Sequence, residues 1–394
     1  MTNTKIKSTT KSVSLIAIRV LVLITTFLVV GIVGYFVSLV ARGYQFDIDS
    51  LTFLENGILV TKSDPDGASI YINGELRGAT NTNLKLSPNT YYVEIKKNGH
   101  QAWQKELTIK KEEVTQVTAH LFKTIPSFSP VTFDGAENPV VSSDFSKIAY
   151  TNKDGLWVMT VSTLPIGFPN EPKKILDIVP VGATYKFSPN SRELILETKL
   201  AVYLLNSNEF TAASELLNII TQKEAILKSW GVEKNKKEIS ELQLVPKELA
   251  EILQKNTSQF TFSPDETMVM YAASSEAKLK ENLISELPGS STQKQERDIK
   301  LGKTYIYDIK EDRNFMVNDN GRSLYWLPTS RHLILPDVGK IIVMDYDGTN
   351  RQTVFTGNYI APHAYPFVNA SKILILTTLG SDSKLPNLYS LSIK

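Results

Sequence analysis

An uncharged run near the N-terminus, residues 20–41, constrains the fold more than any other feature of the sequence. As a helix rising about 1.5 Å per residue it would be roughly 33 Å long, enough to cross a hydrocarbon core of about 30 Å. A secretory signal is the alternative, but its apolar region is about 7–15 residues long and ends in small residues, whereas Leu39 stands three positions before the cleavage point that Ala41 would mark. We therefore expect an uncleaved transmembrane anchor over residues 13–41, preceded by a stub of residues 1–12.

The charges on either side of the run predict its orientation. Four basic residues precede it: Lys5, Lys7, Lys11 and Arg19. After it, Arg42 is followed by three acidic residues: Asp47, Asp49 and Glu55. The excess of positive charge before the span predicts that the N-terminus is cytoplasmic. We expect a single-pass protein of the cytoplasmic membrane, with everything after residue 42 extracytoplasmic.

The bulk composition limits what the rest of the chain does. At about 150 residues per domain, 394 residues suggest two or three units. The net charge is +2, so there is no excess of positive charge to bind a nucleic-acid backbone, and we expect no nucleic-acid partner. The absence of cysteine excludes disulfides, thiolate metal sites, a cysteine nucleophile and a lipid-modified N-terminal cysteine. The anchor must therefore be a peptide segment.

A compact β unit is expected at residues 61–122, after a membrane-proximal spacer at residues 42–60. Residues 68–72 and 91–95 alternate between apolar and polar side chains, and Asn73-Gly74 tolerates the positive φ angles of a tight hairpin. Further alternation follows at residues 105–109 and 114–120. These features predict a small domain made of short antiparallel strands.

Five short motifs follow one another in this unit: Pro65-Asp66-Gly67-Ala68, Tyr71-Ile72-Asn73-Gly74, Gly78-Ala79-Thr80, Ser87-Pro88-Asn89 and Gly99-His100. Their order resembles that of a PEGA domain, although Asp66 stands where the family has glutamate. The resemblance implies a small β-sandwich attached to envelope or surface-layer proteins. It also implies a binding or spacer module, with a wall polymer or a surface-layer protein as partner.

Trp103 is the candidate ligand contact in this domain. An exposed indole beside Lys96 and Lys97 would stack on a sugar ring or bind an anionic envelope polymer. The alternative is that Trp103 fills a very small core.

Internal repeats organise residues 124–394. Five segments combine a strand, a short turn and a second apolar strand: residues 141–150, 187–196, 262–271, 326–335 and 367–376. Aligning them on Ser143, Ser188, Ser263, Leu327 and Val368 gives spacings of 45, 75, 64 and 41 residues. Two spacings match a propeller blade of about 40–45 residues.

The Ser-Pro-Asx turns resemble the WD40-like repeats of TolB-type β-propellers. We expect a mainly β protein with an irregular propeller, its last blade completed by strands near residues 130–141. Stacked β-sandwiches are the alternative.

The two long spacings predict insertions near residues 208–256 and 274–302. The first has an apolar stripe at helical spacing from Ser214 to Trp230, with Gly231 as a stop, and a second helix is expected from Pro246 to Lys255. Trp230 is either a partner contact or an anchor that docks the helix on a blade. The second insertion is rich in polar residues and reads as a solvated loop.

Catalytic and metal-binding motifs are missing. The four histidines lack HExxH spacing, and the chain has no Gly-x-Ser-x-Gly elbow, P-loop or G-x-G-x-x-G. Asp345 and Asp347 suggest calcium, but Thr356 occupies the position where an EF-hand needs glutamate, so we expect a β-turn. We name no catalytic, metal-binding or cofactor-binding residue and expect no enzyme.

The sequence thus favours a non-catalytic binding or scaffold protein of the bacterial cell envelope, with a protein partner on the propeller. A glycan hydrolase that uses carboxylates of the propeller funnel is an alternative. A sensor subunit is another, although the short cytoplasmic stub would have to signal through a partner.

Overall fold

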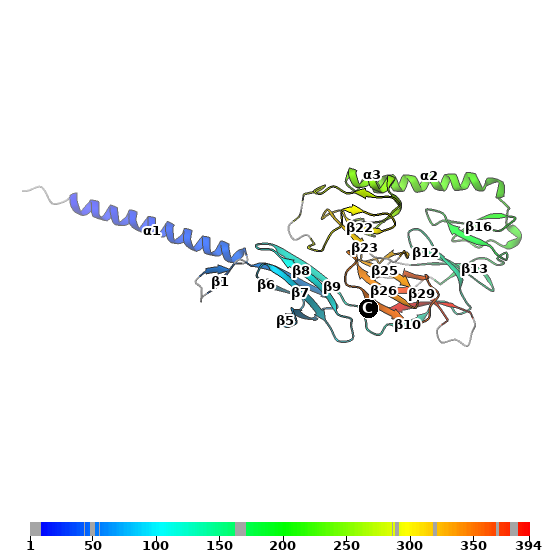
Figure 1. Cartoon of the computed structure of the whole chain (residues 1–394), viewed down its shortest axis with the longest axis horizontal. Helices are drawn as coiled ribbons and strands as arrows, with labels where there is room; N and C mark the ends of the chain where they lie inside the picture. The colour runs from blue at the N-terminus through cyan, green and yellow to red at the C-terminus, as the bar shows by residue number, and fades with distance from the viewer. Residues whose placement is uncertain are drawn as a thin grey trace, which may run out of the picture.

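The architecture is that of a computed structural model, which describes residues 9–42, 44–47, 52–54, 56–161, 171–285, 287, 291–317, 321–367, 370–378 and 385–394. Residues 1–8 of the expected stub and Val368, which the repeat alignment used, lie outside the described residues. The fold is mainly β, as predicted, with an apolar helix at the N-terminus, a small β-sandwich and a set of propeller-like sheets (Figure 1).

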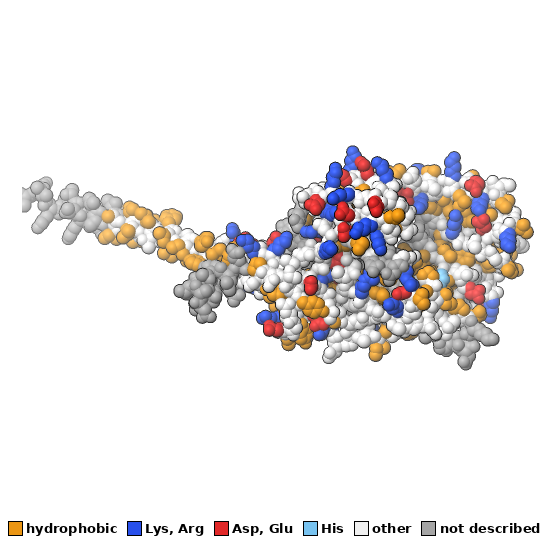
Figure 2. Space-filling view, in the orientation of Figure 1, with side chains coloured by type: hydrophobic (Ala, Val, Ile, Leu, Met, Phe, Trp, Pro, Cys, Tyr) orange, Lys and Arg blue, Asp and Glu red, His pale blue; other side chains and the backbone are white. Residues whose placement is uncertain are grey.

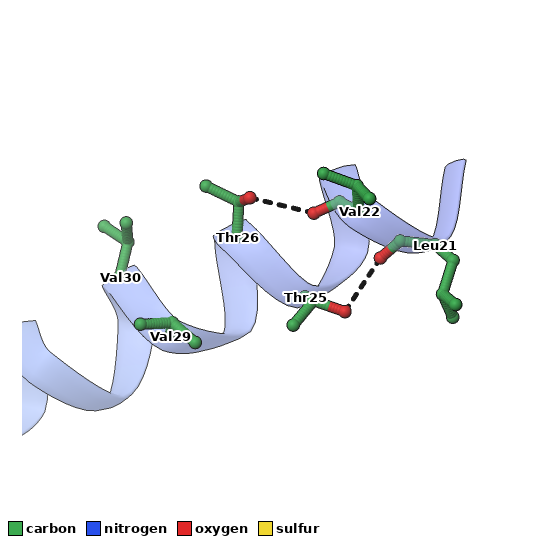
Figure 3. Close-up of a pocket in the computed structure, with 6 residues that line it drawn as sticks. All are labelled: Leu21, Val22, Thr25, Thr26, Val29 and Val30. Carbon is green, nitrogen blue, oxygen red and sulfur yellow. Dashed lines mark hydrogen bonds between the residues drawn. The ribbon is translucent and has the colours of Figure 1, made fainter. Parts of the chain in front are cut away.

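The N-terminal helix α1 (Thr9–Ala41) projects away from the rest of the molecule (Figure 1). Its segment Ala17–Ala41 has a mean hydropathy of 2.7, and apolar side chains cover it (Figure 2). Thr25 Oγ1 donates to Leu21 O and Thr26 Oγ1 donates to Val22 O, each at 2.8 Å, beside a shallow groove between helix side chains (Figure 3). Such internal hydrogen bonds satisfy both hydroxyl donors where no water is present. The helix is long and apolar enough to cross a membrane.

Two sheets form the small domain. Between α1 and this domain, β1 (Gln45–Asp47) pairs with β2 (Thr52–Leu54). One sheet has the order β6-β3-β9, with β3 (Gly57–Asp64), β6 (Thr82–Leu86) and β9 (Val114–His120). The other has the order β5-β4-β7-β8, with β4 (Ser69–Ile72), β5 (Glu75–Ala79), β7 (Asn89–Lys96) and β8 (Trp103–Ile109).

Side chains from both sheets share one core, so the domain is a β-sandwich. Leu59 on β3 and Ile95 on β7 are both fully buried in it. Asn73 and Gly74, with φ of 50° and 85°, form the hairpin turn predicted between β4 and β5. Strand β3 begins at Gly57, inside the expected spacer, because Leu59 belongs to the core and needs its strand paired on both sides.

Five antiparallel sheets of three or four strands follow one another in the described part of residues 127–394, and we call them blades 1 to 5. Blade 1 contains β11 (Glu137–Val141), β12 (Lys147–Asn152), β13 (Gly155–Thr160) and β14 (Lys173–Leu176). Blade 2 contains β15 (Thr184–Phe187), β16 (Glu193–Glu197) and β17 (Val202–Asn206). Blade 3 contains β18 (Thr257–Phe262), β19 (Met268–Ala273), β22 (Thr304–Asp308) and β23 (Arg313–Val317). Blade 4 contains β24 (Tyr325–Trp326), β25 (His332–Asp337), β26 (Lys340–Asp345) and β27 (Gln352–Thr356).

Blade 5 is closed by a strand from the start of this region. It contains β28 (Ala364–Phe367), β29 (Lys372–Thr377) and β30 (Asn387–Ser392), and β10 (Ser127–Pro130) pairs with β30. A strand from the start of this region therefore completes the last blade, as predicted. This strand, β10, lies slightly earlier than the predicted residues 130–141. Residues 137–141 instead form the first strand of blade 1.

Packing between neighbouring sheets gives the order of the blades. Separate apolar cores join blade 1 to blade 2, blade 5 to blade 1, blade 4 to blade 5 and blade 3 to blade 4. Between blades 2 and 3 lie helices α2 (Lys223–Leu242) and α3 (Lys247–Lys255), which run along one edge of the molecule (Figure 1). Trp230 of α2 packs on blade 2, and Leu249 of α3 packs on blade 3. The helical insertion thus takes the place of a blade in the series.

The boundaries of the first helix were predicted wrongly. Instead of a helix from Ser214, two short 3₁₀ turns, Ala213–Glu215 and Ile220–Gln222, precede α2, which continues through Gly231 to Leu242. The cause is the open edge of β17, where Val202 N–H donates to Asn218 Oδ1 at 3.1 Å and Val202 O accepts from Ile219 N–H at 2.8 Å. These bonds hold the preceding segment in a non-helical path. The second helix begins after Pro246 and ends at Lys255, as predicted.

The described part of the second insertion is fastened to blade 3 and is not a solvated loop. Strands β20 (Ala277–Lys278) and β21 (Asp298–Ile299) pair, and Ile299 is buried in the core of blade 3 and α3. Arg297 and Asp312 form an ion pair at 3.0 Å, with side chains 10% and 5% exposed. The polar composition of this insertion suggested a solvated loop, but several of its residues make specific contacts with blade 3.

Candidate functional site

The repeat turns share one backbone geometry. In four blades, the first residue of the turn accepts a hydrogen bond at its carbonyl from the fourth residue: Ser142 from Phe145, Ser188 from Ser191, Ser263 from Glu266 and Leu327 from Ser330. Each fourth residue has a φ of 55° to 62°. Ser142 is thus the counterpart of Ser188, so the alignment on Ser143 was wrong by one residue.

The third turn residue organises the side chains. Ser142 Oγ donates to Asp144 Oδ1 at 2.6 Å, and Ser263 Oγ donates to Asp265 Oδ1 at 2.7 Å. Neighbouring turns are linked, since Ser191 Oγ of blade 2 donates to Asp144 Oδ1 of blade 1 at 2.8 Å. Burial opposes ionisation of Asp144, but its hydrogen bonds to serine donors outweigh that effect and lower its pKa. These carboxylates are structural parts of the turns.

The turns surround a cavity of about 1110 Å³. Residues of all five blades and of α2 line it, and nine of the lining side chains are aromatic: Phe145, Phe187, Trp230, Phe260, Phe262, Tyr271, Tyr325, Trp326 and Phe367. Charged side chains of both signs also line it: Asp144, Lys186, Lys234, Lys237, Glu238, Glu241, Glu266 and Arg322. A large apolar cavity with a few polar groups is the usual form of a binding site.

Helix α2 forms the wall of this cavity between blades 2 and 3. Asn190 Nδ2, in the turn of blade 2, donates to Glu233 Oε1 of α2 at 3.0 Å. Farther along the helix, Glu241 lies 3.7 Å from Lys237 Nζ. Burial raises the pKa of Glu241, and repulsion from Glu266 adds to that effect. The helix therefore contributes both apolar and charged groups to the cavity.

The structure does not bring the predicted ligand residues of the small domain together. Trp103 is 3% exposed and packs in the sandwich core, so the ligand-contact hypothesis for it is corrected. Its position on β8 opposite Ile95 points it inward, and a domain this small needs the bulk. Lys96 pairs with Glu94 at 2.6 Å, and Lys97 Nζ donates to Asp66 O.

Trp230 is also buried, at 8% exposure. It packs on Ile195 and Val202 of blade 2, and its Nε1 donates to Glu193 Oε2 at 3.4 Å. Trp230 also lines the cavity, but its burial on blade 2 makes it the docking anchor of α2 and corrects the expectation of an exposed partner contact.

The junction between the small domain and blade 4 was missed from the sequence. Lys105 Nζ lies 3.0 Å from Asp345 Oδ2 and 2.6 Å from Asp347 Oδ2, and the three side chains are 10%, 10% and 1% exposed. Desolvation disfavours the charged lysine, but the two aspartates outweigh it and raise its pKa. The expected β-turn is confirmed, since Gly348 N–H donates to Asp345 O at 2.9 Å. The only sign of this junction in the sequence was that Lys105 lies two residues after Trp103 on β8 and so points to the same face of the strand.

Further hydrogen bonds join the two domains. Gln101 Nε2 donates to Thr353 O at 2.7 Å, and Gln352 Nε2 donates to Ala102 O at 3.2 Å. From the second insertion, Gln293 Nε2 donates to Glu106 O at 2.6 Å. The junction is therefore a polar interface with several independent contacts.

Comparisons with known proteins add the family of the small domain. No curated protein matches the chain. Similar solved structures include one assigned as TolB from Agrobacterium tumefaciens, at 13% identity over 64% of this chain and 73% of that one, with a TM-score of 0.23. An oligogalacturonate lyase from Vibrio parahaemolyticus is 10% identical over 77% and 86%, with a TM-score of 0.25. TolB from Acinetobacter baumannii is 10% identical over 83% and 64%, with a TM-score of 0.23.

The propeller-like architecture consequently rests on the order and packing of the blades described above. For the small domain the match is direct, because residues 56–125 match the PEGA domain family, as the motif order suggested. The small β-sandwich of this chain is a PEGA domain.

Proposed function

We propose that this chain is a membrane-anchored, extracytoplasmic and non-catalytic binding protein of the bacterial cell envelope. In this proposal α1 holds the protein in the cytoplasmic membrane with its N-terminus inside. The PEGA domain contacts a cell-wall polymer or a surface-layer protein, and the cavity of the blades receives a segment of a protein partner.

The cavity is the observation that carries the proposal. Its volume of about 1110 Å³ exceeds that of an ordinary small-molecule site, and its aromatic lining offers large contact areas to apolar side chains. Lysines and glutamates from α2, such as Lys234 and Glu238, add groups that would orient polar parts of a peptide. The carboxylate of Asp144 is already occupied by turn hydrogen bonds, which favours binding over acid or base chemistry.

The proposed placement rests on the helix and its flanking charges. The described part of α1 contains a span of 25 residues, Ala17–Ala41, and basic residues concentrate before it. Tyr44, just after the helix, donates its hydroxyl to Glu112 Oε1 of the PEGA domain at 2.5 Å. The PEGA domain would therefore stand next to the membrane surface, with the cavity farther out.

Capture of the partner tests the function. Tagged full-length protein is incubated with detergent-solubilised native membranes, and retained proteins are quantified by mass spectrometry. We expect Lys186→Glu and Phe260→Ala, which alter the cavity, to reduce capture of the same protein about tenfold or more, because contacts of this kind contribute about 2 kcal/mol.

The matched control is Lys199→Glu, an exposed lysine on blade 2 that does not line the cavity. It should leave capture unchanged. Equal retention by wild type and both cavity variants would contradict the proposal, provided that their melting temperatures agree.

A glycan hydrolase stays the second candidate because of one observation. The raised pKa of Glu241, with Glu266 nearby, is the kind of perturbation that a general acid requires. Activity on a panel of envelope glycans that Glu241→Gln abolishes would favour this candidate. A sensor subunit would instead need a membrane partner with an output domain.

A further inference from the structure

Two histidines meet face to edge where the PEGA domain contacts blade 4. The ring of His120, at the end of β9, lies 4.7 Å from the ring of His332 on β25, at an interplanar angle of 68°. The ring of Phe122 also packs edge-on against His332, at 5.6 Å. His332 is 3% exposed, and its Nδ1 lies 2.8 Å from Thr329 Oγ1. His332 is thus shielded from water, and His120 is half-buried.

Most of the charged groups around the pair are bound to one another. Asp345 and Asp347 bind Lys105, as described above, and Lys394 Nζ lies 2.6 Å from Asp64 Oδ2. His332 Nε2 is 3.6 Å from Asp345 Oδ1, beyond hydrogen-bond distance. The groups that face the two rings are three carboxylates, which are Asp64, Asp345 and Asp347, and two amines, which are Lys105 and Lys394. Together these groups carry one net negative charge, so they balance one imidazolium but not two.

Both histidines are neutral at neutral pH, because the pKa of each ring lies below its ordinary value. Burial, the neighbouring His120 and the two lysines lower the pKa of His332 well below its ordinary value. Burial and Lys394 lower the pKa of His120, and Asp64 opposes them only in part. In an open junction both rings would titrate near their ordinary pKa of about 6.5.

The sign of the pH dependence follows from this difference. Below about pH 6.5 the histidines of the open junction bind protons, whereas those of the closed junction do not, so acid favours opening. Each unit of pKa depression changes the ratio of open to closed junction by about tenfold per histidine. The closed junction is fully stable above this range and loses stability as the pH falls toward the lowered pKa values.

We propose that the contact between the PEGA domain and blade 4 is an acid-sensitive latch. At neutral pH the latch fixes the blades on the PEGA domain and so fixes the cavity relative to the anchor. Protonation of His120 and His332 places two cations beside Lys105 and Lys394, and the domains separate. They stay connected through residues 121–126, between β9 and β10.

Distance measurements between the domains test the latch. The chain has no cysteine, so spin labels are placed at Leu76→Cys on the PEGA domain and Leu200→Cys on blade 2, where the native side chains are 62% and 85% exposed. The full chain is held in lipid nanodiscs. We expect one narrow distance distribution at about pH 7.5 and a reversible broadening by about pH 5.

A second pair separates opening of the latch from unfolding. Labels at Leu200→Cys and Val338→Cys, both within the blades, should keep a narrow distribution at both pH values. If this pair broadens at the same pH as the first pair, the blades unfold and the latch is refuted. A first pair that stays narrow down to about pH 4.5 would also refute it.

Variants identify the groups that titrate. His120→Gln combined with His332→Gln should remove the broadening near pH 5, and His120→Gln alone should move its midpoint to lower pH. His363→Gln is the matched control, because burial lowers the pKa of His363 too, but this residue lies in blade 5 beside Tyr365. Broadening that persists in the double variant overturns the proposal. If the double variant does not fold, an unchanged midpoint for His120→Gln overturns it.

Discussion

Replacing Lys105 with Met should lower the free energy of unfolding by about 3–5 kcal/mol, because the change leaves two carboxylates buried without a counter-charge. Asp345 and Asp347 are 10% and 1% exposed in the presence of the lysine, and both lie within 3.0 Å of its Nζ. Methionine keeps the apolar stem that lies near Trp103 but supplies no charge. Guanidinium denaturation of the full chain, followed by tryptophan fluorescence, measures the loss.

A double-mutant comparison separates charge from packing. Adding Asp345→Asn and Asp347→Asn to the Lys105→Met variant should recover much of the stability, since no uncompensated charge then stays buried. Lys85→Met is the control, because Lys85 is exposed on β6 of the PEGA domain and its replacement should change stability by less than about 0.5 kcal/mol. If Lys105→Met is as mild as this control, the junction does not depend on the buried ion pairs.

Replacing Trp230 with Ala should cost about 3–5 kcal/mol, the usual cost of removing a buried aromatic side chain. The indole joins α2 to Ile195 and Val202 on blade 2, away from the apolar core that joins this blade to blade 1. We expect a lower melting temperature together with increased hydrogen exchange in α2. Partner capture should also fall, because α2 forms one wall of the cavity.

Val232→Ala on the same helix serves as the matched control, since Val232 is 51% exposed. Its effect should stay within about 0.5 kcal/mol. If Trp230→Ala leaves melting unchanged but abolishes capture, Trp230 is a partner contact after all and its docking role is wrong.

Features that depend on local pattern could be predicted from the sequence. The length and apolarity of α1 follow from composition alone, and the Asn73-Gly74 hairpin follows from the positive φ angles that these residues tolerate. The repeated turns could be recognised because each one needs a particular set of small polar residues at fixed positions. The same turns line the cavity, but the cavity itself was not predicted from the repeats.

Features that depend on contacts between residues far apart in the sequence could not be predicted from it. The start of α2 is set by the edge of β17, which supplies bonds to Asn218 and Ile219 that a helical pattern does not reveal. Trp103 gave the signal of a ligand contact because its neighbours in sequence are basic, yet alternation along β8 turns it inward. Lys105 and Asp345 are 240 residues apart, and nothing local to either one predicts their pairing.

The pairing of the cavity with a partner outside the membrane is tested most directly by photo-crosslinking in intact spheroplasts. A photoreactive amino acid is placed at Lys186, which lines the cavity, and at Lys199, which does not. We expect a crosslinked protein from position 186 alone, and we expect protease added outside the cells to digest the crosslinked product. Crosslinking from position 199 but not 186, or a product that the added protease cannot reach, would contradict this expectation.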